Sequence, residues 1–136
     1  MPGTKTILIV DDDREVVASL KALLESKGHR VLSAHDGNAG LALSESGQPD
    51  LILVDMMMPH KSGFIVLETL KRRGAASPKI VMMTANEGGR HRAYAEMLGV
   101  DDYLRKPFSF DELSAVIDRL LPDAAAPPIE RSESPG

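Results

Sequence analysis

Five polar side chains stand where apolar runs of this sequence end, and together they could perform phosphoryl chemistry. They are three carboxylates, one hydroxyl and one amine: Asp11, Asp12, Asp55, Thr84 and Lys106. Carboxylates held close together make one another harder to ionise, so such a group needs a cation. Because the groups of this set that could bind a cation provide only oxygen ligands, they favour a hard ion, Mg²⁺ or Mn²⁺. Water and phosphate oxygens would complete its coordination.

Asp55 is the candidate nucleophile of this set. It follows four apolar residues, 51–54, which read as a strand buried on both faces, so its carboxylate is held on rigid backbone. A carboxylate in that position can attack phosphorus and become an aspartyl phosphate. Lys106 would neutralise one phosphoryl oxygen and Thr84 would donate a hydrogen bond to another, which is the charge stabilisation that phosphoryl transfer requires.

The elements that must position these side chains alternate along the chain. Short apolar runs predict strands at residues 6–10, 29–34, 51–54, 79–83 and 101–104. Helical spacing of apolar residues predicts helices at 14–27, 36–47, 62–74, 86–99 and 109–121. Their starts carry candidate N-caps, namely Asp13, Asp36, Ser62, Asn86 and the capping-box residue Ser109.

Strict alternation of strand and helix implies an α/β fold, a parallel sheet with helices on both faces. In such sheets ligands bind beyond the carboxyl ends of the strands, where the strand order switches. We therefore expect the five polar side chains to converge on one rim. Gly37 and Gly40 lower the helix propensity of the second helix. In the fourth helix we expect Ala93, Tyr94, Met97 and Leu98 to face inward.

Composition limits the function classes that remain. The 136 residues can support one compact core, and the net charge of −4 gives no overall basic field, so we expect no direct nucleic acid binding. The chain has no cysteine, and no apolar run approaches the length of a membrane span or a signal-peptide core. We expect a cytoplasmic protein without membrane insertion.

The domain is expected to occupy residues 1–121. Pro122 ends the last helix, and residues 122–136 are rich in Ala, Pro, Ser and charge without periodicity. We interpret this segment as a flexible tail or linker. It could be a free terminus or the start of a connection to an output domain.

Five motifs in order give the sequence a family resemblance, and together they are far more specific than any one alone. They are Ile9-Val10-Asp11-Asp12-Asp13, Val54-Asp55-Met56-Met57-Met58-Pro59, Ser62-Gly63, Met83-Thr84-Ala85 and the run from Gly99 to Phe108 that contains Lys106-Pro107. Through these residues the chain resembles, from about residue 5 to 121, the receiver domain of two-component response regulators, the family of the chemotaxis response regulator.

The resemblance implies a flavodoxin-like, doubly wound (βα)5 sandwich with strand order 2-1-3-4-5. It makes Asp55 the phosphoacceptor, Asp12 a direct Mg²⁺ ligand and Asp11 an acid that acts mainly through water. The backbone carbonyl of Met57 would complete the protein's share of the coordination. Thr84 and Tyr103 match the switch pair of the family, and the Lys106-Pro107 bond would be cis.

The implied function is a phosphorylation-controlled switch in two-component signal transduction. A sensor histidine kinase or histidine phosphotransfer protein would supply the phosphoryl group, and the face formed by the fourth helix, fifth strand and fifth helix would contact a downstream output protein or domain. The chain would catalyse its own phosphorylation and slow dephosphorylation without turnover of an external substrate. Phosphorylation-linked dimerisation stays open.

The sequence departs from the family pattern at Ser62, which replaces a frequent aspartate and should only change the helix cap. Met57 and Asn86 occupy positions that border the path of hydrolytic water in the family. We hypothesise that the apolar Met57 slows loss of the phosphoryl group.

Two rival functions make different predictions. A metal-dependent phosphatase with an acid nucleophile would turn over external phosphoesters. Against it, the candidate nucleophile Asp55 does not lead an Asp-x-Asp pair after the first strand, and we see no inserted cap domain. A scaffold that retains the fold without being phosphorylated would bind its partner equally well after Asp55→Asn.

Overall fold

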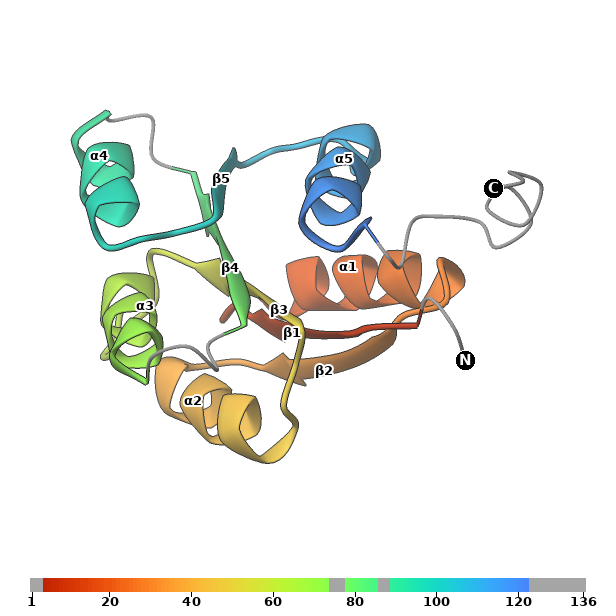
Figure 1. Cartoon of the computed structure of the whole chain (residues 1–136), viewed down its shortest axis with the longest axis horizontal. Helices are drawn as coiled ribbons and strands as arrows, with labels where there is room; N and C mark the ends of the chain where they lie inside the picture. Colours follow the sequence, from red (N-terminus) through yellow and green to blue (C-terminus); the bar gives the residue numbers. More distant parts are fainter. Residues whose placement is uncertain (1–3, 74–77, 86–88, 123–136) are drawn as a thin grey trace, which may run out of the picture.

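The computed structural model describes residues 4–73, 78–85 and 89–122 (Figure 1). The strands are β1 (Thr6–Val10), β2 (Arg30–Ala34), β3 (Leu51–Asp55), β4 (Lys79–Thr84) and β5 (Asp102–Arg105). The helices are α1 (Arg14–Ser26), α2 (Gly37–Ser46), α3 (Gly63–Arg72), α4 (Gly89–Met97) and α5 (Phe110–Leu120). All ten elements lie where the sequence predicts them, with ends that differ by a few residues.

The sheet is parallel, with strand order β2-β1-β3-β4-β5, so the flavodoxin-like architecture is confirmed. The order switches beside β1, whose neighbours are β2 and β3. In register, Val10 pairs with Val54 and Val54 with Met82, so the three central strands end at nearly the same level. The residues that follow these strands therefore share one rim.

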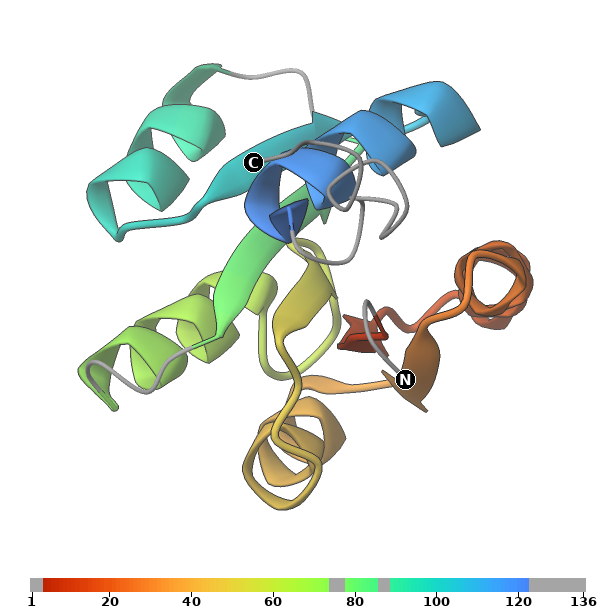
Figure 2. The ribbon, with the colours of Figure 1, turned by 45° about the vertical axis from the view of Figure 1, so that its right-hand side comes forward.

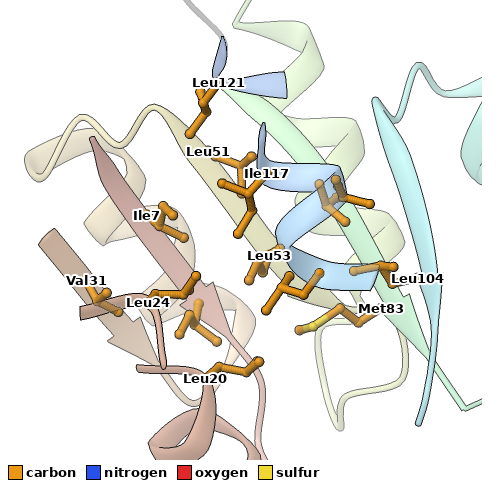
Figure 3. Packing of buried hydrophobic residues seen from close by; sticks show 14 of the residues in the cluster. Ile7, Leu20, Leu24, Val31, Leu51, Leu53, Met83, Leu104, Ile117 and Leu121 are labelled. Carbon is orange, nitrogen blue, oxygen red and sulfur yellow. The ribbon is translucent and has the colours of Figure 1, made fainter. Parts of the chain in front are cut away.

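Helices cover both faces of the sheet (Figures 1 and 2). On one face α1 and α5 pack on alternate strand residues such as Ile7, Leu53 and Met83, with Leu24 and Ile117 among the helix contacts (Figure 3). On the other face α2, α3 and α4 pack on the remaining strand residues. Because β3 is buried along its whole length, its backbone and Asp55 have little freedom to move.

Three of the expected N-caps are confirmed by hydrogen bonds. The Asp13 carboxylate accepts from the amides of Glu15 and Val16, Asp36 caps α2, and Ser109 forms a full capping box with Glu112. Ser62 occupies the N-cap position of α3 but makes no side-chain capping bond. Asn86 and residues 123–136 of the expected tail lie outside the described residues.

The two glycines of α2, which the sequence suggested would weaken the helix, lie where the helix contacts neighbouring segments. A Cβ on Gly40 would lie 2.8 Å from Val10 Cγ2, so this glycine lets the helix approach β1 closely. Partly buried leucines then fill the remaining interface with the sheet.

The prediction of which α4 residues face inward is wrong. Ala95 is fully buried, whereas Ala93 is exposed, Tyr94 is 42% exposed and Met97 is 76% exposed. Only Leu98 of the four predicted residues packs against the core. The helix has no long apolar residue facing the sheet, and the side that meets the sheet is centred on the small residue Ala95. In the described part of the chain, no helix has the length and apolarity needed to cross a membrane.

Candidate functional site

The carboxylates of Asp11, Asp12 and Asp55 meet at the rim of the sheet. One carboxylate oxygen from each lies within 4.8 Å of the others. Asp11 and Asp55 are buried because they extend directly from β1 and β3, and Asp12 is exposed in the following loop. The predicted convergence of three acids from two strands is therefore present in the structure.

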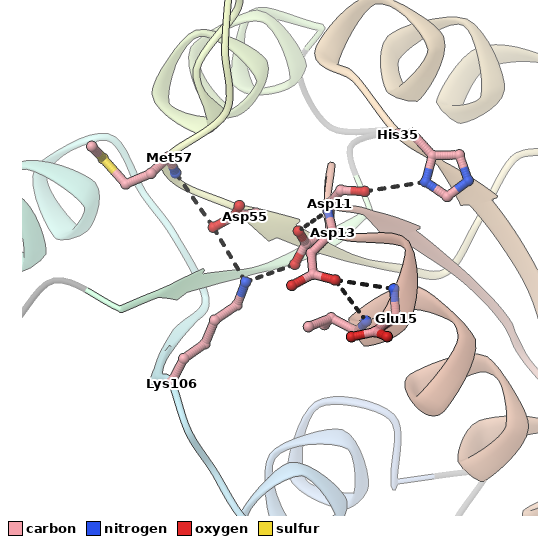
Figure 4. A network of polar contacts seen from close by, with 8 residues as sticks. Asp11, Asp13, Glu15, His35, Asp55, Met57 and Lys106 are labelled. Carbon is pink, nitrogen blue, oxygen red and sulfur yellow. Dashed lines mark hydrogen bonds and ion pairs between the residues drawn. The ribbon is translucent and has the colours of Figure 1, made fainter.

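Lys106 lies between the two buried acids (Figure 4). Its Nζ donates to Asp11 Oδ2 at 2.7 Å and lies 3.6 Å from Asp55 Oδ1. The other Asp11 oxygen accepts from the backbone amide of Asp13 at 2.9 Å. Both oxygens of Asp11 thus have partners within the protein. The Lys106 backbone amide donates to the Thr84 carbonyl, which joins the end of β5 to the end of β4.

The charge distribution perturbs the ionisation of Asp55 and Lys106. Burial raises the pKa of Asp55 to about 6, with the negative charge of Asp11 acting in the same direction and Lys106 opposing it. Burial alone would lower the pKa of Lys106, but its hydrogen bond to Asp11 and the charge of Asp55 outweigh burial and raise that pKa. Near neutral pH the site therefore holds an ammonium beside a carboxylate whose ionised form is destabilised.

The donor set fits a hard divalent cation. The three acids supply only oxygens, and two of them are buried side by side with a single lysine as the nearby cation among the described residues. A divalent ion would relieve the repulsion that raises the pKa of Asp55. Exposed Asp12 leaves one side open to solvent, which suits an ion that retains water ligands.

The backbone of Met57, rather than its side chain, lies next to the Asp55 carboxylate. Its amide points to Asp55 Oδ1 at 3.4 Å, while its side chain is 57% exposed and extends away from the carboxylate (Figure 4). The Lys106-Pro107 peptide bond is cis, as the resemblance implied.

Thr84 and Tyr103 are brought together at the neighbouring part of the rim. Thr84 is fully buried at the end of β4, and Tyr103 lies half-buried on the adjacent strand β5. The Tyr103 hydroxyl shares a hydrogen bond with Thr84 and lies 3.8 Å from the Met56 sulfur. Burial raises the pKa of Tyr103, although that hydrogen bond opposes the change. The side chains of Thr84 and Tyr103 therefore interact at this part of the rim.

Two further residues shape the site without having been predicted to do so. A Cβ on Gly63 would lie 2.3 Å from the Asp55 carbonyl oxygen, so only glycine fits there. His35 Nδ1 lies 3.3 Å from the Asp11 carbonyl oxygen and extends the contact between β1 and β2 beyond the strand ends (Figure 4). The Ser62-Gly63 motif was a signal for the glycine, whereas nothing in the sequence marked His35.

The family model of the response regulator receiver domain matches residues 7–118 of this chain. The transcriptional regulatory protein CpxR of Escherichia coli (strain K12) is 44% identical over 115 residues, which are 85% of this chain and 48% of that protein. The transcriptional regulatory protein PhoP of alkaline phosphatase synthesis in Bacillus subtilis (strain 168) is 38% identical over 128 residues, which are 93% of this chain and 53% of that protein. The chain thus spans about half the length of these relatives.

Solved structures show the same fold. A CheY-like receiver domain protein of Methanospirillum hungatei JF-1 has a TM-score of 0.83 at 30% identity, covering 90% of this chain and 97% of that one. The response regulator TrrA of Thermotoga maritima, solved in complex with Mg(2+)-BeF, has a TM-score of 0.77 at 32% identity, covering 86% of this chain and 99% of that one.

Proposed function

The chain belongs to the response regulator receiver family, and we propose that Asp55 is the residue on which it accepts a phosphoryl group. The observation that carries this proposal is the placement of Asp55 at the carboxyl end of the central strand β3, beside Asp11, Asp12 and Lys106. Asp11 is also buried beside two acids and Lys106, but both of its oxygens already accept hydrogen bonds, from Lys106 and from the Asp13 amide, whereas the contacts of Asp55 are longer.

In the proposed step, a carboxylate oxygen of Asp55 bonds to the phosphorus of a phosphohistidine on a kinase or phosphotransfer protein. The bond between phosphorus and the imidazole nitrogen breaks, and that nitrogen keeps the electron pair and is neutralised by a proton from solvent. Because the pKa of Asp55 is about 6, its carboxylate is mostly ionised at neutral pH and available for attack. The Lys106 ammonium, 3.6 Å from Asp55, is placed to balance negative charge on the transferred group.

Asp11, Asp12, Asp55 and the Met57 carbonyl would hold a divalent cation, for which we propose Mg²⁺. When bound, this ion supplies positive charge that attracts the phosphoryl oxygens. The complex of the Thermotoga maritima relative with Mg(2+)-BeF supports this assignment.

The added charge would then bias the pair Thr84 and Tyr103. A phosphoryl oxygen next to Asp55 would accept a hydrogen bond from the Thr84 hydroxyl, and because Thr84 interacts with Tyr103, this bond would couple the site to the face formed by α4, β5 and α5. We propose that this face controls an output partner. The relatives are transcriptional regulatory proteins about twice as long as this chain, so output could reside in the same polypeptide or in a separate protein.

Three wider assignments complete the proposal. The receiver domain would occupy residues 1–121 and act in the cytoplasm, with residues 122–136 as a tail or linker. The chain itself would not bind nucleic acid, consistent with its net charge of −4. It would accept and slowly lose its phosphoryl group without turning over an external substrate.

The test is incubation with acetyl phosphate and Mg²⁺, followed by separation on a phosphate-affinity gel. Wild type should give a retarded band and Asp55→Asn should not. Asp102→Asn is the matched control, because this carboxylate pairs with Arg119 on α5, outside the site, and its variant should be retarded like wild type. A retarded band with Asp55→Asn, or none with wild type, would contradict the proposal.

A further inference from the structure

The aromatic ring of Tyr103 is in contact with a cation of α4. The guanidinium carbon of Arg92 lies 5.6 Å from the centroid of the Tyr103 ring, within the range of a cation–π interaction. The hydroxyl end of the same ring points toward Thr84 and the Met56 sulfur. Tyr103 is therefore held at its hydroxyl by groups of the sheet rim and over its ring by a side chain of the neighbouring helix.

Arg92 is itself oriented by a neighbour on α4. Its Nε donates to Glu96 Oε2 at 3.1 Å, one helical turn further along. A guanidinium bonded through its edge to a carboxylate keeps its flat face free to lie over an aromatic ring. The pair of Arg92 and Glu96 thus presents a fixed cation to the position that Tyr103 occupies when its hydroxyl meets Thr84.

The contact between Arg92 and Tyr103 is important for α4 because this helix buries few side chains. Among the described residues of the helix, only Ala95 is fully buried, and Tyr94 and Met97 are exposed. The helix also contacts α3, where the Phe64 ring lies 5.1 Å from the Tyr94 ring and 5.9 Å from the His91 ring, so few of its side chains are held by the sheet itself. A ring that leaves the rim would lose Thr84 and Arg92 together, so the position of Tyr103 and the attachment of α4 are linked.

We propose that Arg92 is a positioning residue that favours the inward orientation of Tyr103 before phosphorylation. This inference rests on the proposed function of Asp55. It identifies Arg92 as a residue that would regulate the switch linked to Asp55. A cation–π contact at a partly exposed site is worth about 0.5 to 1 kcal/mol, which corresponds to roughly a 2- to 5-fold shift toward the inward state. By linkage, a phosphoryl group that favours the same orientation would bind more tightly by up to this factor, which is reached when the inward state is the less populated one before phosphorylation.

The first measurement follows Tyr103 without phosphorylation. The chain contains two tyrosines, so incorporation of 3-fluorotyrosine in a Tyr94→Phe background gives a single ¹⁹F resonance. Arg92→Ala should move this resonance toward that of free 3-fluorotyrosine, and Arg92→Lys, which keeps the charge, should restore part of the difference. Arg90→Ala, which removes an exposed cation about 200° around the same helix, is the matched control and should leave the resonance unchanged.

The second measurement is titration with beryllofluoride in the presence of Mg²⁺, as a mimic of the phosphoryl group. Arg92→Ala should weaken binding, by up to about 5-fold, relative to wild type and Arg90→Ala. An unchanged resonance or an unchanged affinity in Arg92→Ala overturns the inference. Asp55→Asn separates the two proposals: if it binds beryllofluoride like wild type, the assignment of Asp55 fails, whereas the fluorine resonance still reports the role of Arg92.

Discussion

Replacing Asp55 with asparagine should make the metal-free protein more stable at neutral pH. Burial and Asp11 raise the pKa of Asp55 from an ordinary 3.8 to about 6 in the folded state. Between these two values the unfolded chain gives up the proton while the folded chain keeps it, so the free energy of unfolding falls as the pH rises. Above about pH 6 the full penalty is present, and below about pH 4 it vanishes.

The magnitude follows from the difference of about 2 in pKa, which corresponds to about 3 kcal/mol. An asparagine has the shape of the aspartate without its charge, so Asp55→Asn should recover up to this amount at pH 7.5. For a domain of this size, about 3 kcal/mol corresponds to a rise in melting temperature of about 10 to 15 °C. At pH 4 the variant and wild type should differ little, because the carboxyl is neutral in both states.

The assay is urea unfolding with EDTA at pH 4 and pH 7.5. Glu25→Gln is the matched control, an exposed carboxylate on α1 whose conversion to an amide should change stability by less than about 0.5 kcal/mol at either pH. Equal gains for Asp55→Asn at both pH values, or a loss at pH 7.5, would refute the electrostatic account of the site. Added Mg²⁺ should stabilise wild type and have a much smaller effect on Asp55→Asn.

Three further outcomes are expected. Gly63→Ala should cost about 1 to 3 kcal/mol in urea unfolding, since its Cβ would meet the Asp55 carbonyl oxygen, whereas Gly89→Ala, with no described atom within 4 Å, should not destabilise. Burial lowers the pKa of the His29 imidazole below 6.5 in the folded state. As the pH falls below 6.5, the imidazole is protonated first in the unfolded chain, so the free energy of unfolding decreases. His29→Gln should therefore show a smaller loss in urea midpoint between pH 7 and pH 5. Met57→Asn, which replaces an apolar side chain beside Asp55 with a polar one, should shorten the lifetime of the phosphorylated state, followed as decay of the retarded gel band. An unchanged lifetime would contradict the hypothesis that the apolar Met57 slows loss of the phosphoryl group.

Residues at strand ends were the most predictable part of the molecule. Asp11 and Asp55 each follow a run of β-branched and aliphatic residues, and parallel strands that alternate with helices must end at one rim. The side-chain chemistry then identified the kind of site without knowledge of any distance. The same logic placed Thr84 and Lys106, because Thr84 is the last residue of β4 and Lys106 follows β5.

Contacts between elements were less predictable, because they depend on how closely the backbones approach. The inward face of α4 is set by Ala95, a residue too small to stand out in an apolar pattern. The fit of Gly63 against the Asp55 carbonyl depends on the path of a loop. Likewise, the sequence predicted that Lys106 would neutralise a phosphoryl oxygen, but gave no sign that its Nζ lies closer to Asp11 than to Asp55.

The strand β5 has a consequence for how this domain can associate with other molecules. It is the shortest strand, with four residues, it lies at the edge of the sheet, and it carries Asp102 and Arg105. Edge strands recruit strands of other chains unless they are short or charged. This edge therefore resists sheet extension and the aggregation that follows from it, so association on this side would depend on side chains of α4 and α5 and could be reversible.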